Sequence, residues 1–457
     1  MNETLRVFLK GKKIYTLSTP DPLSARPHNP NFHLFESSGS NIFIPDGSRI
    51  YKIDKKIQKL LQNLALKNNT DAIDELLKKY GLQSLGLIND APPTDPPLTS
   101  ISLAIAQKCN LGCNYCYAQE GGFGGKEKNM PLEKAIAAVD LLFRENTLAN
   151  KMNIAFLGGE PLVNRPALRE TTLYAYEKAM ANGTEVNFSI TTNGTLLTKE
   201  DANFFEEYGF AVTVSLDGIG ETHDQLRPFK SGKGSYERII RNVEPLLSLQ
   251  KKMQVSARVT VTPKNLNLRD TLDELIRLGF HSVGFSPMLS SPTGKGEMDT
   301  ISLESLLGSM IDCGLEFERK VIDGERYPFS NMSTALKEIH KGTHRPYACG
   351  AGAGYLGVSA NGELAACHRF VENPKGYFGN IEGGIDRVIQ RKWLTERHVH
   401  RQEPCNSCWA RYLCGGGCHH EVIHKGRPAC DYIRGWLHFV LQSYTRILEQ
   451  RPDYFYS

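Results

Sequence analysis

The sequence predicts an α/β protein built around a parallel sheet that is curved or closed. From about residue 100 to about residue 290, six stretches typical of β-strands alternate with stretches that have the periodicity of amphipathic helices. The connections between them are short, as expected where a strand–helix unit repeats. Because parallel strands of such a sheet present polar residues at their carboxyl ends, we expect the chemistry of the protein at that edge.

The six units can be placed along the chain. The expected strands are Ser102–Ala106, Asn153–Leu157, Glu185–Thr191, Ala211–Ser215, Gln254–Val261 and Ser282–Ser286. The helices between them include Pro131–Arg144, Lys199–Tyr208, Tyr236–Leu247 and Arg269–Leu278. We assign residues 99–340 to this central domain.

A separate module precedes the sheet, over residues 1–90. Its expected strands are His33–Phe35, Asn41–Ile44 and Arg49–Ile53. Asp54 is expected to cap a helix over Lys55–Leu66, and Thr70 to start a second helix. This pattern predicts a small α+β, winged-helix-like module. The proline-rich run at residues 91–98 separates it from the central domain, because clustered prolines interrupt both helices and central strands.

Composition limits the classes of function. The formal net charge is +4 and the pI is about 8.4, so neither nucleic acid nor a membrane surface is indicated as a partner. We find no apolar run of about 18 residues and no signal-peptide pattern, and expect a soluble, cytoplasmic protein. Eleven cysteines in such a chain indicate metal or redox use. Cys313 alone lies outside a motif, on a helical stretch at Ser302–Lys320, and is expected in the core.

The cysteines Cys109, Cys113 and Cys116 follow the first expected strand with the spacing C-x3-C-x2-C. Three thiolates can hold three corners of a four-iron cluster and leave the fourth iron without a protein ligand. A zinc knuckle is the alternative, but zinc takes four ligands and no fourth Cys or His stands in or just after this stretch. The motif resembles that of the radical S-adenosylmethionine (SAM) enzymes, in which SAM chelates the open iron through its amino and carboxylate groups.

This resemblance implies a partial (β/α)6 barrel and a set of SAM-binding residues. Gly158, Gly159 and Glu160 resemble the family's GGE motif, which holds the SAM amino group; an ordinary turn is the alternative. Ser215 and Arg227 match the positions that meet the SAM carboxylate, although Arg227 could also be a solvated surface residue. Two further residues are expected at the cofactor site, Asn193 after the third strand and Tyr115 before the last cysteine of the triad.

A second cysteine field fills residues 341–457. Its spacing resembles the SPASM extension of radical SAM peptide maturases, which carries two auxiliary four-iron clusters and brings the expected total to three [4Fe-4S] clusters. The resemblance assigns the distal cluster to Cys405, Cys408, Cys414 and Cys430, and the nearer cluster to Cys349, Cys367 and Cys418. The nearer cluster then has one open iron. That iron could dock a substrate thiolate, or be capped by water, His368 or His419.

His368 is the candidate catalytic base. Sulfatase-maturing relatives carry an aspartate after the corresponding cysteine, and this chain has histidine instead. A histidine could take the same proton near neutral pH. The alternative is a structural hydrogen bond to cluster sulfur or to the backbone.

The resemblance implies a peptide maturase that forms a 5′-deoxyadenosyl radical and abstracts hydrogen from its substrate. The preferred function is thioether crosslinking, from Cys sulfur to carbon, in a ribosomally made precursor peptide or protein subunit. Carbon–carbon cyclophane formation and sulfatase-type formylglycine formation are the alternatives, and a non-catalytic iron–sulfur electron carrier is the alternative from another class. Expected partners are the precursor, bound through the N-terminal module as an added strand, and an electron donor such as flavodoxin or ferredoxin. A purely structural N-terminal module remains the alternative.

Overall fold

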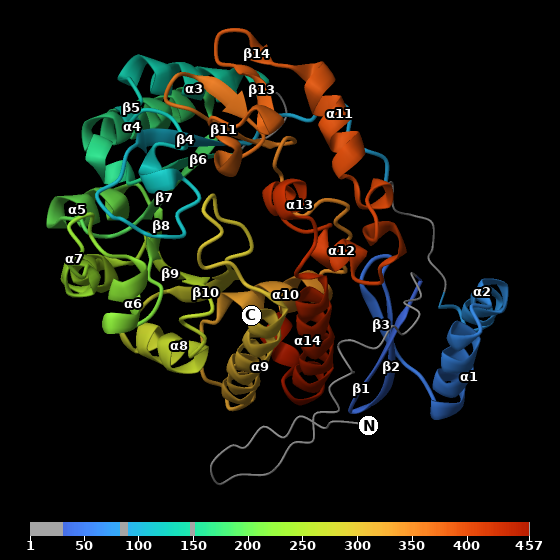
Figure 1. Cartoon of the computed structure of the whole chain (residues 1–457). Helices are drawn as coiled ribbons and strands as arrows, with labels where there is room; N and C mark the ends of the chain where they lie inside the picture. The colour runs from blue at the N-terminus through green and yellow to red at the C-terminus, as the bar shows by residue number, and fades with distance from the viewer. Residues whose placement is uncertain (1–30, 83–89, 147–150, 457) are drawn as a thin grey trace.

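The structure is a computed structural model that describes residues 31–82, 90–146 and 151–456. Its centre is a sheet whose six parallel strands follow one another in space in the order β4-β6-β7-β8-β9-β10 (Figure 1). The strands are β4 (Ser100–Gln107), β6 (Lys151–Gly158), β7 (Glu185–Thr192), β8 (Ala211–Ser215), β9 (Gln254–Val261) and β10 (Ser282–Pro287). All six strands expected from the sequence are confirmed, which supports the partial barrel of strand–helix units.

Helices cover the outer face of this sheet. They are α3 (Leu132–Glu145), α4 (Arg165–Asn182), α5 (Lys199–Glu207), α6 (Glu221–Leu226), α7 (Tyr236–Leu249) and α8 (Leu268–Arg277). Helix α4 is not among the helices to which the sequence analysis gave a residue range. Its buried residues are mainly alanines and threonines, such as Ala175 and Thr171, so that small side chains rather than a stripe of large apolar ones form its contact face.

The N-terminal module is a three-stranded antiparallel sheet in the order β1-β2-β3, with two helices. Its elements are β1 (His33–Ser37), β2 (Gly39–Ile44), β3 (Arg49–Lys52), α1 (Lys55–Leu66) and α2 (Thr70–Lys79). The Asp54 carboxylate accepts hydrogen bonds from the N–H groups of Lys56 and Ile57, each at 2.8 Å, and so caps α1 as expected. The predicted small α+β module is confirmed.

The central sheet continues into the cysteine-rich part of the chain. Strand β11 (Tyr355–Val358) pairs parallel with β4 on the side opposite β6. Strands β12 (Glu363–Ala365), β13 (Tyr377–Asn380) and β14 (Gly384–Ile385) follow antiparallel, and the short β5 (Lys128–Asn129) pairs with β4. The barrel and the start of the cysteine-rich region therefore share one hydrogen-bonded sheet.

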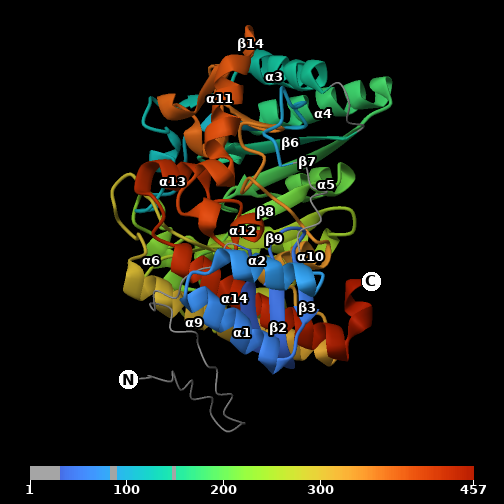
Figure 2. The same cartoon turned by 90° about the vertical axis from the view of Figure 1, so that its right-hand side faces the viewer.

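Two long helices join the three regions. Helix α14 (Cys430–Gln450) packs along α9 (Thr300–Ile322), where Gly314 makes room for the Phe439 ring; a Cβ there would lie 2.4 Å from the ring. The other side of α14 contacts β1, and the N-terminal module lies against this helix (Figure 2). His33 Nε2 lies 2.8 Å from His438 Nδ1. Cys313 on α9 is fully buried, as predicted.

The remaining helices surround the cysteine motifs. They are α10 (Ser330–His340), α11 (Arg387–Arg397), α12 (Arg411–Cys414) and α13 (His419–Lys425). Across the part of the chain that the structure describes, no helix is both long enough and apolar enough to span a bilayer.

Candidate functional site

The cysteine triad lies on the loop that leaves the carboxyl end of β4. The Cys116 N–H donates to the Cys113 carbonyl at 3.2 Å, and the Leu111 N–H donates to Cys109 Sγ at 3.5 Å. The pKa of Cys113 is raised to about 12, mainly by burial. Arg227 opposes the increase in this pKa, and the neighbouring thiols Cys116 and Cys109 contribute to it. Buried neighbouring thiols become thiolates together only where positive charge compensates them, which the iron ions of a cluster would supply. This chemistry fits a cluster held by the triad.

Glycines at the end of β6 bring its backbone against the triad loop. The Gly159 N–H donates to the Ala106 carbonyl at 2.9 Å. A Cβ on Gly159 would lie 2.5 Å from the Lys108 carbonyl oxygen, and one on Gly158 would lie 2.2 Å from the Ala106 carbonyl oxygen. Only glycine permits this approach at both positions.

Glu160 is fully buried beneath this turn. Its carboxylate accepts from the Asn193 N–H at 2.7 Å, the Thr192 hydroxyl at 2.8 Å and the Leu162 N–H at 3.1 Å. Burial raises its pKa, while these three donors lower it. The hydrogen bonds fix the position of the carboxylate at the ends of β6 and β7, where the sequence predicts the SAM amino group.

Asn193 connects β7 to the triad loop. Its Nδ2 donates to Asn110 Oδ1 at 2.9 Å and lies 3.7 Å from Cys109 Sγ. Its Oδ1 accepts from the N–H and the hydroxyl of Thr195. The amide therefore orients the loop that carries the first cysteine.

Arg227 lies in a buried network with Tyr115 and Asp217. One guanidinium nitrogen donates to the Tyr115 hydroxyl at 2.8 Å and lies 3.3 Å from an Asp217 oxygen, and that hydroxyl donates to the same carboxylate. Asp217 also accepts from the Thr260 N–H at 2.7 Å. Arg227 is thus not a solvated surface residue.

The second edge of Arg227 still has hydrogen-bonding capacity. Its buried Nε has no hydrogen-bond partner among the described residues, although most buried donors are paired. Ser215 is the last residue of β8, the strand from which the chain leads through Asp217 to Arg227. An unpaired guanidinium edge beside polar strand ends fits a ligand carboxylate such as that of SAM.

The C-terminal cysteines separate into two groups by their electrostatic influence on one another. The pKa of Cys367 is raised to about 12, mainly by burial, and the nearby Cys418 and Cys349 contribute to that increase. Burial raises the pKa of Cys405 to about 11, and Cys414, Cys430 and Cys408 contribute to that increase. These are the groups that the resemblance assigns to the nearer and the distal cluster. Their role as cluster ligands stays a prediction.

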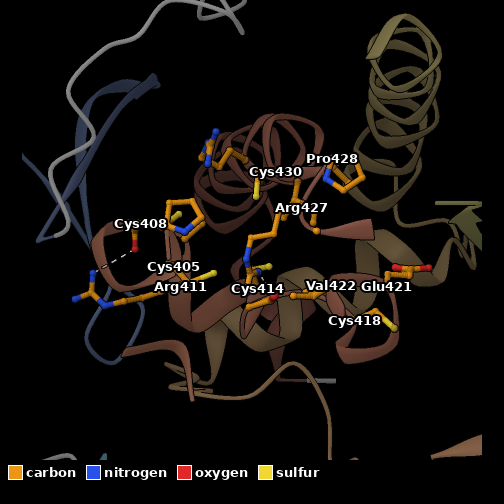
Figure 3. Close-up of a pocket in the computed structure, with 18 of the residues that line it drawn as sticks. Cys405, Cys408, Arg411, Cys414, Cys418, Glu421, Val422, Arg427, Pro428 and Cys430 are labelled. Atoms are coloured by element: carbon orange, nitrogen blue, oxygen red, sulfur yellow. Dashed lines mark hydrogen bonds between the residues drawn. The ribbon is translucent and has the colours of Figure 1, made fainter. Parts of the chain in front are cut away.

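Figure 3 shows the distal group. Cys405 and Cys408 begin and end one turn, Cys414 is the last residue of α12, and Cys430 is the first residue of α14. These four side chains lie around Arg427, while Cys418 lies apart beside Glu421 (Figure 3). All five thiols line the same pocket. Gly415 permits the turn after Cys414, because a Cβ there would lie 2.4 Å from the backbone of Tyr347.

His368, next to Cys367, is held by a hydroxyl chain. Its Nδ1 lies 2.8 Å from the Tyr355 hydroxyl, which lies 2.8 Å from the Ser102 hydroxyl on β4. The pKa of His368 is lowered to about 4, mainly by burial and in part by the neighbouring Arg369. The imidazole is therefore neutral at pH 7 and can accept a proton, as a weak base.

The two cysteine fields adjoin at this histidine. The ring of Tyr117, next to Cys116, lies 6.0 Å from the ring of His368. The Arg369 guanidinium lies 5.4 Å from the Tyr117 ring centre, 2.7 Å from a Glu421 oxygen and 3.7 Å from Cys418 Sγ. Sequence reasoning did not identify Tyr117, Tyr355 and Arg369, although each stands beside a cysteine or in a glycine-rich motif already singled out.

Comparisons with known proteins support this interpretation. Residues 103–278 match the family model of the radical SAM superfamily. The serine-type anaerobic sulfatase-maturating enzyme of Klebsiella aerogenes is 25% identical over 359 residues, which cover 75% of this chain and 86% of that enzyme. The cysteine-type anaerobic sulfatase-maturating enzyme of Clostridium novyi is 29% identical over 341 residues, which cover 70% and 88%.

The fold has a solved counterpart in native anSMEcpe with bound AdoMet. The two structures superpose with a TM-score of 0.64 at 19% sequence identity, over 77% of this chain and 98% of the other. The superfamily match begins within β4, includes the cysteine triad and the strands β6 to β9, and ends after α8, before β10. The chain carries a radical SAM domain over residues 103–278, and its central sheet continues into a cysteine-rich C-terminal region.

Proposed function

We propose that this enzyme is a maturase that oxidises a side chain of a peptide or protein substrate. The observation that carries the proposal is the contact between the two cysteine fields, where Tyr117 beside the triad meets His368 beside Cys367. A hydrogen abstraction that leaves a substrate radical needs an electron acceptor nearby to complete a two-electron oxidation. Auxiliary clusters held by the C-terminal thiols would supply that acceptor next to the reaction site.

The triad and the polar residues at the strand ends fit an iron–sulfur cluster and SAM. When bound, the triad cluster and SAM supply a one-electron cleavage that makes a hydrogen-abstracting radical. Cys109, Cys113 and Cys116 would hold the cluster, and Glu160 and Arg227 would orient the two polar ends of SAM. His368, neutral and oriented by Tyr355, would accept the proton that the oxidised substrate releases. Two auxiliary clusters, and thus three in all, are part of the proposal.

The relatives favour sulfatase-type oxidation, in which a serine or cysteine side chain becomes the aldehyde of formylglycine. Their names describe serine-type and cysteine-type sulfatase maturation, and the matched residues cover most of their length. This is the reaction that the sequence analysis placed behind crosslinking.

Thioether formation is the second candidate, and two features favour it. His368 stands where sulfatase-maturing relatives are expected to carry aspartate. The N-terminal module also presents β3, which pairs only with β2 among the described strands and leaves one edge for an added strand. A precursor peptide bound there would be delivered to the barrel through the contact between β1 and α14.

One experiment separates the two reactions. A peptide that contains cysteine and serine, encoded beside this gene, is incubated anaerobically with the reconstituted enzyme, SAM and reduced flavodoxin or ferredoxin. Formylglycine formation gives a product that reacts with a hydrazide probe. Thioether formation removes two hydrogens and one alkylatable thiol, and leaves the product inert to hydrazide. A peptide that is unchanged while SAM is cleaved would reject that peptide as substrate, and an enzyme that never cleaves SAM would reject the proposed function.

A further inference from the structure

Arg258 is a cation on the inner face of the barrel. Alternate residues of β9 point to opposite sides of the sheet, and Val255, Ala257, Val259 and Val261 are all buried in the outer core. Arg258 therefore faces inward. The same strand register places it beside Ser215 of β8 and Gly284 of β10.

The guanidinium of Arg258 has little compensation from the protein. It donates to the Ser286 hydroxyl, and no carboxylate of a described residue forms an ion pair with it. Burial lowers its pKa. The side chain is nevertheless exposed, because it borders open space inside the protein. Its guanidinium therefore faces this open space without a counter-charge from the described residues, and its donor edge is available to an anionic ligand.

The open space is a cavity of about 250 Å³ between the barrel and the helices that close its side. Figure 1 shows α10 between β10 and α14. Residues of β9, α10 and α14 line the cavity, together with Arg345 and Leu413. Gly284 keeps part of this space free, since a Cβ there would lie 3.1 Å from an Arg258 nitrogen and 2.5 Å from the Ser330 hydroxyl.

The lining is net positive. Arg258 and Arg345 stand against one carboxylate, Glu338, which lies 3.7 Å from Arg345 Nε. The cavity is separate from the expected SAM site, because none of the triad cysteines, Glu160, Ser215 or Arg227 lines it. A negatively charged group is therefore the ligand that this cavity suits, and Arg227, not Arg258, is the arginine expected to bind SAM.

We infer that Arg258 binds a carboxylate of the peptide substrate, presented by an acidic side chain or by a free C-terminus. The planar guanidinium can hold a carboxylate through two parallel hydrogen bonds, which orients as well as binds. The inference rests on the proposed function and deepens it, since it makes the segment inside the barrel anionic. Arg258 then sets substrate specificity from a cavity apart from the cluster ligands.

The first test measures binding of a carboxylate without any reaction. Phenylglyoxal labelling of Arg258 in the reconstituted enzyme is followed by mass spectrometry, with exposed Arg241 as internal reference. N-acetylglutamate methylamide is expected to slow labelling of Arg258 at least about threefold and to leave Arg241 unchanged. The glutamine analogue is expected to protect neither. Equal protection by both analogues, or none by either, would overturn the inference.

The second test uses the neighbouring-gene peptide, labelled with fluorescein, and measures binding by anisotropy. We expect R258M to weaken binding about tenfold, which corresponds to about 1.4 kcal/mol, R258K to weaken it less, and the control R241M to bind as the wild type does. Replacing the peptide's acidic residues by amides, or amidating its C-terminus, identifies the source of the carboxylate, because the relevant change has no further effect in R258M.

The outcomes separate this inference from the proposed function. Unchanged peptide binding with weakened SAM binding in R258M would overturn the inference and assign Arg258 to SAM. If the wild-type enzyme leaves the peptide unmodified but N-acetylglutamate methylamide still protects Arg258, the anion site stands and that substrate is rejected. Circular dichroism and iron content of R258K serve as controls for folding.

Discussion

Replacing Asp217 by asparagine is expected to destabilise the barrel through one buried charge. Asp217 is fully buried and lies 3.3 Å from Arg227. The Thr260 N–H donates to Asp217 at 2.7 Å in the wild-type structure. Asparagine keeps the shape of the side chain and can still accept this hydrogen bond. What disappears is the negative charge that compensates Arg227. Breaking a buried pair on one side costs about 3–5 kcal/mol, and we expect D217N to lower the free energy of unfolding by about 3 kcal/mol.

Urea unfolding of the cluster-free protein, followed by circular dichroism, measures this effect at unchanged m-value. The matched control is D323N, which removes an exposed partner of Arg319 and should change stability by no more than about 0.5 kcal/mol. The double variant D217N/R227M should lose about 1–3 kcal/mol less than the sum of the two single variants, because each single change leaves one buried group unpaired. Strictly additive losses, or a D217N protein as stable as D323N, would show that Asp217 and Arg227 are not a coupled buried ion pair.

Three further predictions follow from the site. Burial lowers the folded-state pKa of His223 to about 3, so the unfolded chain binds the proton more readily than the folded chain does. The free energy of unfolding should therefore fall as the pH drops below about 6.5. Urea unfolding at pH 5 and pH 7 should show a weaker pH dependence for H223Q than for the wild type. G159A should abolish SAM cleavage in a product assay, because its Cβ would lie 2.5 Å from a backbone oxygen, whereas G308A, with no atom within 4 Å, should retain it. C430S should lower iron from about twelve to about eight atoms per chain if three four-iron clusters form, and the core variant C313A should not; equal iron in both would contradict the distal ligand set.

Regular periodicity made the barrel predictable. The spans Ala211–Ser215 and Gln254–Val261 agree with β8 and β9 residue for residue, because apolar residues there alternate or run together between clear turn signals. The bounds of helix α4 were not predicted, because its contact face is built from small residues and shows no stripe of large apolar side chains. The long helix α14 was not predicted, because it begins at Cys430, at the end of a cysteine-rich region without regular periodicity.

The site was predictable where chemistry imposes spacing and not where folding brings distant residues together. The triad and the C-terminal cysteines could be grouped from the sequence because cluster ligands recur at characteristic intervals. The hydroxyl chain from His368 through Tyr355 to Ser102 joins residues far apart in the chain, through the pairing of β11 with β4. Likewise, the sequence did not indicate a ligand-binding role for Arg258, because the cavity that suggests it is formed with residues of α10 and α14, which are distant in the chain.

SAM cleavage by the reconstituted protein distinguishes a working radical SAM site from cysteines that hold iron without this chemistry. The wild-type enzyme, reduced anaerobically with SAM, should form 5′-deoxyadenosine, and C113A should form none while C313A behaves as the wild type does. Since Cys113 lies in the triad and Cys313 in the core, the pair separates cluster chemistry from loss of fold. Wild-type protein that holds iron but cleaves no SAM, or C113A that cleaves it normally, would contradict the assignment of the radical SAM site.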